Sequence, residues 1–416
     1  MITKMFTVTL IAAMFLFNKA CDRHEPPQQQ EENVRKNIEL TETQKGLCRT
    51  ANVFTFDFLK ILTGKEDKDV NIFASPFSLQ TVLAMTAEGA ARDTKEEMLT
   101  ALRLSDFSEA DIAEFYKVII PALQGVDKKT VMEIANSLWS KEFIEIKEDF
   151  SARLQKNYYA ECRTLLTDPF EAAREVNAWC SQKTHGMINR VVDQVSEDQM
   201  VALINALYFK GEWNDKFNER YSRDEKFHNH DGSTKEVTMM RKTDDMDVYL
   251  GEEAWSLSLP YGNRAYRMTI ILPKEGVDVD KVVASLDAES WRQYLYRGYE
   301  REVNLSLPKF ETEYSAADLC IKTLNEMGME KAFKRSADFS GISDIALYIS
   351  QIIHKAKIKV NEEGTEAAAV SYVGMELATA IPREEPIDFK VDRPFIYAIS
   401  EVSTGAITFI GVQKQF

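Results

Sequence analysis

The sequence predicts a single large α+β domain, and three observations support this. The chain has 416 residues, of which 44% are hydrophobic and 28% charged, so it can form a buried core beneath a charged surface. Helical spacing concentrates in the early part of the chain, and strand-like runs concentrate in the late part. We find no internal repeat. Helices and strands that are segregated along the chain are typical of α+β folds rather than alternating α/β folds.

The beginning of the chain has the pattern of a signal peptide. Lys4 precedes an apolar run of thirteen residues from Met5 to Phe17. A helix needs roughly 20 apolar residues to cross a bilayer, so this run is too short for a membrane span and fits an export signal. We therefore assign residues 1–20 to a signal peptide.

Cys21 is a candidate lipidation site. It follows Ala20, and a small residue before Cys at this position resembles the processing site of bacterial lipoproteins, although Asn18 and Lys19 depart from the usual pattern. Residues 21–44 are polar and indicate a tether. The sequence thus predicts an exported protein. It is either a lipoprotein of the outer membrane or cell surface with a lipid anchor, or a freely secreted protein.

Two helices can be placed after the tether. Ser75 is a good N-cap and Pro76 suits the first helical position, and apolar residues follow at helical spacing until Gly89 ends the helix. Thr94 and Glu97 form a capping-box pattern, which predicts a second helix with Thr94 as its N-cap.

The strands follow in the later part of the chain. Asp231-Gly232 is typical of a hairpin turn between flanking strands. The strand-like runs are Met200 to Phe209, Met268 to Leu272, Val303 to Leu307, Phe395 to Ile399 and Ala406 to Val412.

Neither the cysteines nor the histidines form a recognisable metal site. The later cysteines are widely spaced without a CxxC pair, so we expect buried free thiols rather than disulfides or zinc ligands. They are Cys48, Cys162, Cys180 and Cys320. His228 and His230 flank one residue beside the hairpin turn, but the sequence offers no third ligand nearby, which favours a solvated turn. The sequence therefore indicates no metal and no cofactor.

Charge and motifs exclude several classes of function. The net charge of -15 argues against binding to nucleic acid and against electrostatic binding to anionic lipid. The patterns GxSxG, HExxH, GxxxxGK[ST] and GxGxxG do not occur, so hydrolase, metalloprotease and nucleotide-binding functions have no local support. We therefore expect no enzymatic activity.

A segment near the C-terminus can form a strand with one uncharged face. Because strand side chains alternate between faces, one face would carry small or apolar residues and the other would carry both carboxylates. Gly364, just before the segment, can supply the backbone freedom of a hinge. An Ala-rich helix is the alternative. The uncharged set is Thr365, Ala367, Ala369, Ser371, Val373 and Met375, and the charged set is Glu366, Ala368, Val370, Tyr372, Gly374 and Glu376.

The chain resembles the serpin family in these and other segments. The stretch Glu362, Glu363, Gly364, Thr365, Glu366, Ala367, Ala368, Ala369 is similar to the hinge of the reactive-centre loop of inhibitory serpins. Phe389 to Phe395 is similar to the signature that follows that loop. Further matches in family order are Asn71 to Ser78, Asn177 to Ile188 and Asn205 to Gly211. The resemblance covers residues 45–416, with the loop at about 362–388.

The resemblance implies a fold and two functional clusters. Helices would pack on a large central mixed sheet, with smaller sheets and an exposed reactive-centre loop. The shutter, where the main sheet parts, would consist of Ser75, Ser78, Asn205 and His354. The breach, where insertion begins, would contain Trp179, Lys309 and Glu362.

The function implied by the resemblance is suicide inhibition of a serine protease, by a monomer that forms a covalent 1:1 complex. The protease serine attacks the loop, and the freed loop inserts into the main sheet before the acyl-enzyme is hydrolysed. Two alternatives stay open: a non-inhibitory serpin acting as carrier, chaperone or structural protein, and an inhibitor of cysteine proteases. The small hinge residues Thr365, Ala367 and Ala369 favour an inhibitor over a non-inhibitory member.

Two positions compete for the cleaved bond. Counting from the hinge places it between Ala378 and Thr379, and a small apolar residue there suits elastase-like proteases. Counting back from Pro394 gives Arg383, which suits trypsin-like proteases. We prefer Ala378, because Pro382 would interrupt an inserted strand.

Overall fold

The computed structural model describes residues 33–196, 199–352, 354–365 and 385–416, and residues 33–416 form one compact unit. This unit begins earlier than the boundary at residue 45 that the sequence suggested. The Asn33 side chain donates to Asp127, and the Ile38 amide donates to Ser403. The last part of the predicted 21–44 tether therefore lies on the folded unit.

The helices begin at side chains that satisfy their first amide groups. Ser75 caps its helix as predicted, with its hydroxyl accepting from the Ser78 amide. Thr41 and Ser108 each form a capping box. The helices are α1 Glu42–Lys65, α2 Pro76–Ala87, α3 Arg92–Ala101, α4 Glu109–Gly125, α5 Glu148–Tyr158, α6 Pro169–Lys183, α7 Val279–Ser285, α8 Ala288–Tyr296 and α9 Ala317–Glu326.

The predicted start of α3 is wrong. The N-cap is Ala91, which makes no side-chain capping bond, and Thr94 lies inside the helix. The Thr94 hydroxyl instead accepts from the amide of Asp338, and the Glu97 carboxylate accepts from the amides of Glu330 and Lys331. The Thr94 and Glu97 side chains, which the capping-box pattern assigned to the helix end, therefore bind amides of residues far away in sequence.

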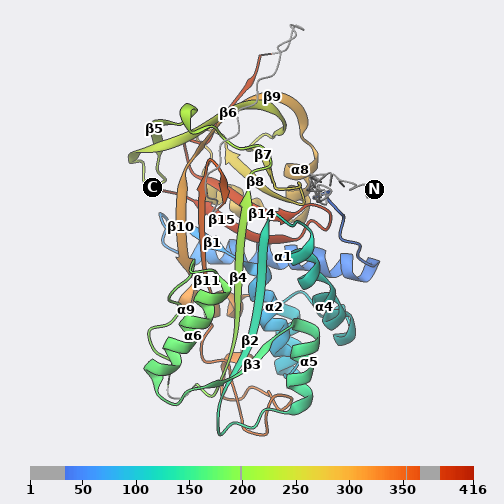
Figure 1. Cartoon of the computed structure of the whole chain (residues 1–416). Coiled ribbons are helices and arrows are strands. Elements are labelled where there is room, and N and C mark those ends of the chain that lie inside the picture. The colour runs from blue at the N-terminus through green and yellow to red at the C-terminus, as the bar shows by residue number, and fades with distance from the viewer. Residues whose placement is uncertain (1–32, 197–198, 353, 366–384) are drawn as a thin grey trace, which may run out of the picture. The chain divides into compact units, whose positions relative to one another are not determined.

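Two mixed sheets hold the strands of the described residues (Figure 1). The six-stranded sheet has the order β10-β11-β12-β4-β2-β3, and the nine-stranded sheet has the order β1-β15-β14-β8-β7-β6-β9-β13, with β5 paired to β6. One pair in each sheet, β2 with β3 and β13 with β9, is parallel. The strands are β1 Ile72–Ala74, β2 Val131–Lys141, β3 Glu161–Leu165, β4 Val201–Glu212, β5 Arg223–His228, β6 Thr234–Leu250, β7 Ala254–Tyr261, β8 Tyr266–Pro273, β9 Tyr299–Pro308, β10 Phe310–Ser315, β11 Lys355–Asn361, β12 Gly364–Thr365, β13 Ile387–Lys390, β14 Phe395–Glu401 and β15 Ile407–Gln413.

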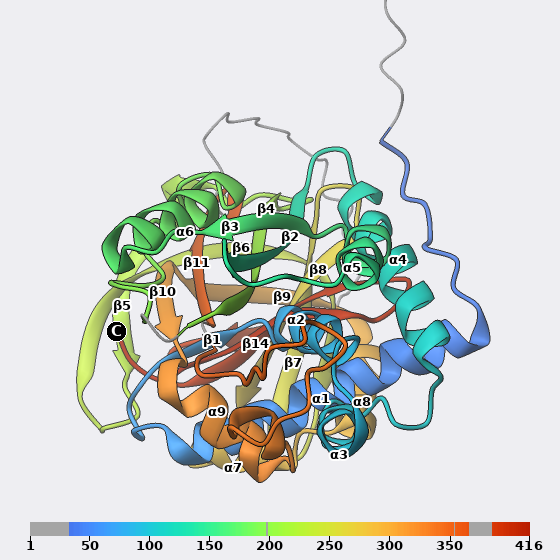
Figure 2. The same cartoon turned by 90° about the horizontal axis from the view of Figure 1, so that it is seen from below.

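The six-stranded sheet lies between helices. Helix α6 packs on one face of β4 and α2 packs on the other, and Figure 2 shows the two helices on opposite sides of this strand. Helix α2 also contacts β15 of the second sheet. The main core lies on the α2 side and includes Leu207 and Phe209 of β4. A smaller core under α6 includes Ile204 and Ala206. The alternation along β4 thus separates two apolar layers.

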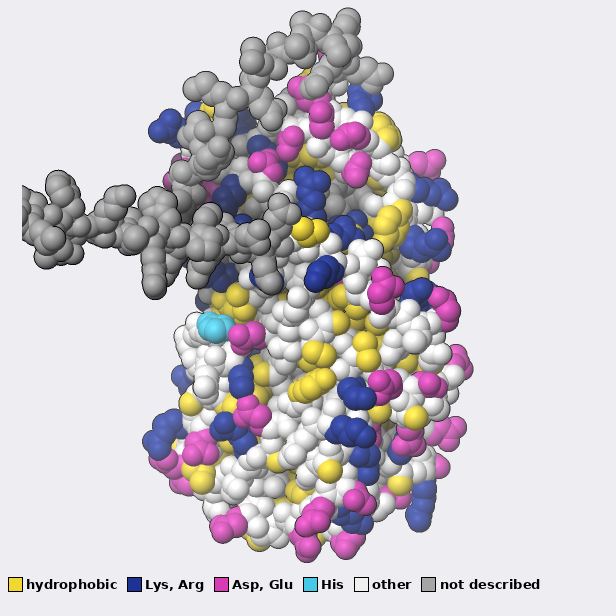
Figure 3. All heavy atoms as spheres, turned by 45° about the vertical axis from the view of Figure 1, so that its right-hand side comes forward, with side chains coloured by type: hydrophobic (Ala, Val, Ile, Leu, Met, Phe, Trp, Pro, Cys, Tyr) yellow, Lys and Arg dark blue, Asp and Glu magenta, His cyan; other side chains and the backbone are white. Residues whose placement is uncertain are grey.

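The predicted α+β fold class is confirmed. Each of the five predicted strands overlaps an observed one, and the Asp231-Gly232 turn joins β5 to β6 with Gly232 at a φ of 83°. Cys48, Cys180 and Cys320 are buried free thiols as expected, but Cys162 is exposed. On the face shown in Figure 3, described acidic and basic side chains are interspersed. None of the described helices is both long and apolar enough to cross a membrane.

Candidate functional site

The candidate site begins at β12, a strand of two residues that lies between β11 and β4. Gly364 and Thr365 pair antiparallel with Asn361 and Val360 of β11 on one side. They pair antiparallel with Glu212 and Gly211 of β4 on the other. Among the described residues, β11 and β4 do not pair directly with each other. The chain therefore enters the sheet between the end of β11 and the end of β4. The facing edges of these two strands continue past Thr365.

Gly364 is required by the close approach of two backbones. Its φ of 148° is disfavoured for residues with a side chain, and a Cβ atom here would lie 2.1 Å from the Gly211 carbonyl oxygen. A hinge at this position therefore needs glycine for steric reasons.

Two buried carboxylates, Glu362 and Glu363, begin the hinge segment. Lys309 Nζ lies 2.7 Å from Glu362 Oε2, and the Ser222 hydroxyl donates to Glu362 Oε1 at 2.7 Å. Burial by itself raises the pKa of Glu362, but the hydrogen bonds from Lys309 and Ser222 outweigh burial and hold this pKa below its usual value. Glu363 pairs with Lys216 at 2.6 Å. The hinge is therefore held at the end of the sheet by ion pairs.

The tryptophan beside the hinge is Trp213. Its indole Nε1 donates to the Asn361 carbonyl, its amide donates to the Glu363 carbonyl, and its ring stacks on Tyr261 with centroids 4.5 Å apart. The Tyr261 hydroxyl lies 2.6 Å from the Thr365 hydroxyl. Trp213 was not among the predicted site residues, although it lies only two residues after the matched Asn205 to Gly211 segment.

Trp179 does not join this group. It lies on the buried face of α6, where its ring meets Trp139 edge-on with centroids 6.4 Å apart and its Nε1 donates to Glu161. Trp179 was predicted to lie beside Lys309 and Glu362, but the structure brings only Lys309 and Glu362 together. Trp179 belongs to the smaller core under α6.

The four predicted shutter residues do lie together, on both sides of the gap between β4 and β11. The Ser75 amide donates to Nε2 of His354, which precedes β11, at 3.1 Å. The Ser75 hydroxyl donates to the Thr408 carbonyl of β15. The Ser78 hydroxyl donates to the side-chain oxygen of Asn205 on β4. The Asn205 amide group then donates to Asn136 of β2, a residue that the sequence did not indicate.

His354 is neutral in this network. Burial lowers its pKa to about 4. Because Nε2 accepts from the Ser75 amide, a proton on Nε2 would set two donors against each other and break this hydrogen bond. Protonation of His354 would therefore disrupt a contact between α2 and the start of β11.

A cavity of about 80 Å³ lies beside this network. Its lining includes Leu79 of α2, Leu207 of β4 and Ala356 of β11. The cavity therefore lies between the two strands that β12 joins at one end, at the level of the shutter residues.

Several predicted site residues lie outside the described residues. They are Cys21, the hinge residues Glu366, Ala367, Ala368 and Ala369, and the candidate cleavage residues Ala378, Thr379 and Arg383.

Comparisons with known proteins agree on one family. The family model described as Serpin (serine protease inhibitor) matches residues 49–414. A serpin-like protein of Thermococcus kodakarensis is 36% identical over 373 residues, which cover 88% of this chain and 85% of that protein. The crystal structure of the thermophilic serpin Tengpin in its native state is similar, with a TM-score of 0.81, 30% identity and coverage of 92% of this chain and 97% of that one. Human thyroxine-binding globulin matches with a TM-score of 0.82, 25% identity and coverage of 90% and 99%.

Proposed function

The chain belongs to the serpin family, and we propose that it is a suicide inhibitor of serine proteases. In this proposal, residues 366–378 follow β12 into the gap between β4 and β11 after the loop is cut. The observation that carries the proposal is β12 itself, because its two residues already have a strand on either side.

The register of β12 specifies where each following residue would lie. Continued without a bulge, the antiparallel pairing places Ala367 between Phe209 and Ile358, and Ser371 between Asn205 and His354. Phe209, Ile358 and Asn205 point toward the α2 side of the sheet, since the first two belong to the main core and the third bonds to Ser78. Thr365, Ala367, Ala369 and Ser371 would thus face the core, with Ser371 level with the shutter. This face is the uncharged one.

The residues on the charged face of the inserted strand would lie beside side chains of opposite charge. The same register places Glu366 between Lys210 and Lys359, on the opposite face of the sheet. Lys359 is exposed and Lys210 is half-buried, so both can pair with a carboxylate that stays in contact with water. A shift of the strand by one residue would instead bury the carboxylate among apolar side chains.

The chemistry belongs to the protease until the loop is cut. The protease serine oxygen attacks the carbonyl carbon of Ala378, an ester forms, and Thr379 leaves as a free amine. Insertion of residues 366–378 would then carry the ester-linked protease along the sheet before water can attack. Fourteen residues from Thr365 to Ala378 make a strand of about 46 Å at roughly 3.3 Å per residue.

The preferred target follows from the residue before the cut. Ala378 is small and apolar, and suits the shallow pocket of elastase-like serine proteases. Cleavage after Arg383 by trypsin-like proteases is the alternative. We also propose that the protein is an exported monomer with a lipid anchor at Cys21, as the pattern of residues 1–20 suggests.

A carrier function is the main rival. Human thyroxine-binding globulin, one of the similar structures, is named for binding thyroxine. The small residues Ala367 and Ala369 favour the inhibitor, because bulky or charged residues at these positions would oppose insertion. Inhibition of cysteine proteases is a further rival, because it would use the same hinge, the same strand register and the same gap between β4 and β11.

The test is a mixing experiment with an elastase, a trypsin and a papain-like cysteine protease, read on a denaturing gel. An inhibitor of serine proteases gives an SDS-stable 1:1 band with elastase, and the band disappears when the elastase serine is replaced by alanine. Mass spectrometry of the released C-terminal peptide should show Thr379 at its N-terminus. Cleavage without any covalent band for any of the proteases would favour the carrier.

A further inference from the structure

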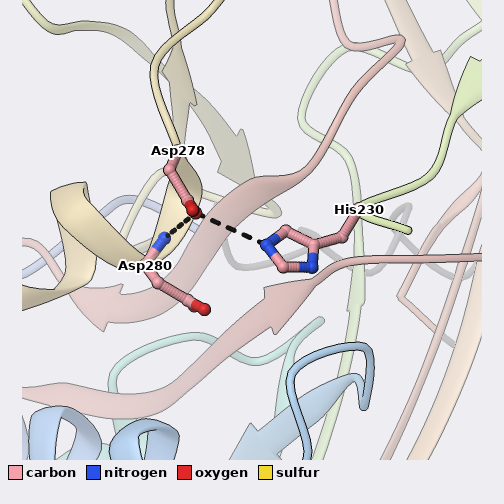
Figure 4. Close-up of side chains that lie close together, drawn as sticks. All are labelled: His230, Asp278 and Asp280. Carbon is pink, nitrogen blue, oxygen red and sulfur yellow. Dashed lines mark hydrogen bonds and ion pairs between the residues drawn. The ribbon is translucent and has the colours of Figure 1, made fainter. Parts of the chain in front are cut away.

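A histidine and three carboxylates meet at the end of the β5–β6 hairpin, where the sequence suggested only a solvated turn. His230 lies in the turn, Asp278 caps the N-terminus of α7 and Asp280 lies in the first turn of that helix. Figure 4 shows the His230 ring and the two carboxylates close to one another. One ligand atom from each residue can be chosen so that all three lie within 4.8 Å of one another.

The two nitrogens of His230 have different surroundings. Nδ1 lies 2.8 Å from the carboxylate of Asp69, which can accept a hydrogen bond from Nδ1 and fix the orientation of the ring. In the tautomer with the proton on Nδ1, Nε2 has a lone pair and lies 3.5 Å from Asp278 Oδ1, which also accepts from the Asp280 amide. A cation between Nε2 and this carboxylate could bind both. A proton on Nε2 would make a poor hydrogen bond at this distance, whereas ligand atoms of a tetrahedral zinc site stand about 3.4 Å apart.

The carboxylates of the cluster outnumber its ammonium group, which favours binding of a divalent cation. Asp69, Asp278 and Asp280 supply three negative charges, and the buried ammonium of Lys414 pairs with Asp280 at 2.8 Å and also donates to the Lys68 carbonyl. Two negative charges remain uncompensated among these groups. Lys414 also donates to Asp280 Oδ2 at 3.1 Å, and Asp280 Oδ1 is a buried atom with no hydrogen-bond partner among the described residues.

We propose that His230 Nε2, Asp278 and Asp280 bind a zinc ion, with Asp69 as the residue that orients the imidazole. A carboxylate that accepts from the far nitrogen of a histidine ligand is the usual support for such a ligand. One nitrogen and two oxygen ligands suit Zn²⁺ better than Mg²⁺, which prefers oxygen ligands alone. Asp278 is exposed, so water can complete the coordination. The ion would join the β5–β6 hairpin to α7.

The test is a titration of the untagged whole chain with Zn²⁺ in competition with a chromophoric chelator. Wild type should bind one more equivalent of zinc than His230→Ala and Asp278→Asn. Asparagine still caps a helix, so Asp278→Asn should fold and its loss of zinc would be specific. His228→Ala is the matched control, because His228 ends β5 two residues before His230, is exposed and is outside the cluster.

Asp69 has a separate readout. Asp69→Asn should keep the equivalent of zinc but weaken its affinity about 10-fold to 100-fold, as expected for a residue that orients a ligand. An excess of Mg²⁺ should not displace the zinc. Equal zinc binding by His230→Ala and His228→Ala, or no binding by wild type, would overturn the proposal.

Discussion

Exchanging Glu366 and Ala367 would test the proposed strand register without changing composition or net charge. In the register continued from β12, the exchanged carboxylate would lie on the core face between Phe209 and Ile358, which are 5% and 1% exposed. The alanine would take the place between Lys210 and Lys359. The exchange therefore moves one charge from the wet face of the sheet to the dry one.

The cost can be estimated from the proton that the carboxyl must take up before it enters the core. At pH 7, protonating a carboxyl with an ordinary pKa near 4.3 costs about 4 kcal/mol, enough to slow insertion by about a thousandfold if the whole cost falls on the rate-limiting step. Hydrolysis of the acyl-enzyme would then be faster than insertion of the loop. At pH 5.5 the cost falls to about 2 kcal/mol, so part of the inhibition should return.

The assay is the stoichiometry of inhibition, measured as the ratio of cleaved chain to covalent complex after reaction with elastase. The exchange variant should be mostly cleaved. Glu366→Ala alone is the control, because an exposed ion pair contributes at most about 1 kcal/mol and its loss should leave the complex largely intact. Wild-type stoichiometry for the exchange variant would refute the register.

Three further predictions concern the sheet end, the shutter and the N-terminus. Lys309→Met should lower the thermal midpoint by an amount equivalent to about 1 to 3 kcal/mol, because it leaves the Glu362 carboxylate with fewer partners. The pKa of Glu362 is lowered in the folded state, so this stabilisation is complete above about pH 4.5 and is lost as the pH falls further. Unfolding scans of wild type and variant should therefore converge at lower pH. The free energy of unfolding should fall by up to about 3 kcal/mol as the pH drops from about 6.5 to 4, because this histidine binds a proton in the unfolded chain but not while His354 is buried. Urea titrations at several pH values should show this slope in wild type but not in His354→Asn. Cys21→Ala should move the protein from the detergent phase to the soluble fraction, and equal partitioning of both forms would favour free secretion.

The sequence predicted well those features that depend on local patterns. Ser75 and Pro76 placed the start of α2, where the Ser75 hydroxyl caps the helix. The pattern was informative because helix capping acts over a few residues. The strand predicted from the alternation after Thr365 lies outside the described residues and stays a prediction.

Features that depend on distant partners were predicted less well. The buried residues of α6, Ala172, Ala173, Val176, Trp179 and Cys180, follow helical spacing, and this signal could have placed Trp179 in a helix core rather than beside Glu362. No local pattern connects His230 to Asp278, or Thr94 to Asp338, because the fold alone brings these segments together. Trp213 was missed for the same reason, since its role depends on Tyr261 and Asn361.

Hydrogen exchange of the chain before and after cleavage by elastase, resolved by peptide mass, tests loop insertion most directly. If the loop inserts, amides of residues 366–375 become strongly protected after cleavage. Amides at the facing edges of β4 and β11 gain protection with them, because each would acquire a strand partner. The cleaved form should also melt at a higher temperature. Fast exchange throughout residues 366–375 after cleavage, with an unchanged or lower melting temperature, would contradict loop insertion and with it the proposed inhibitory mechanism.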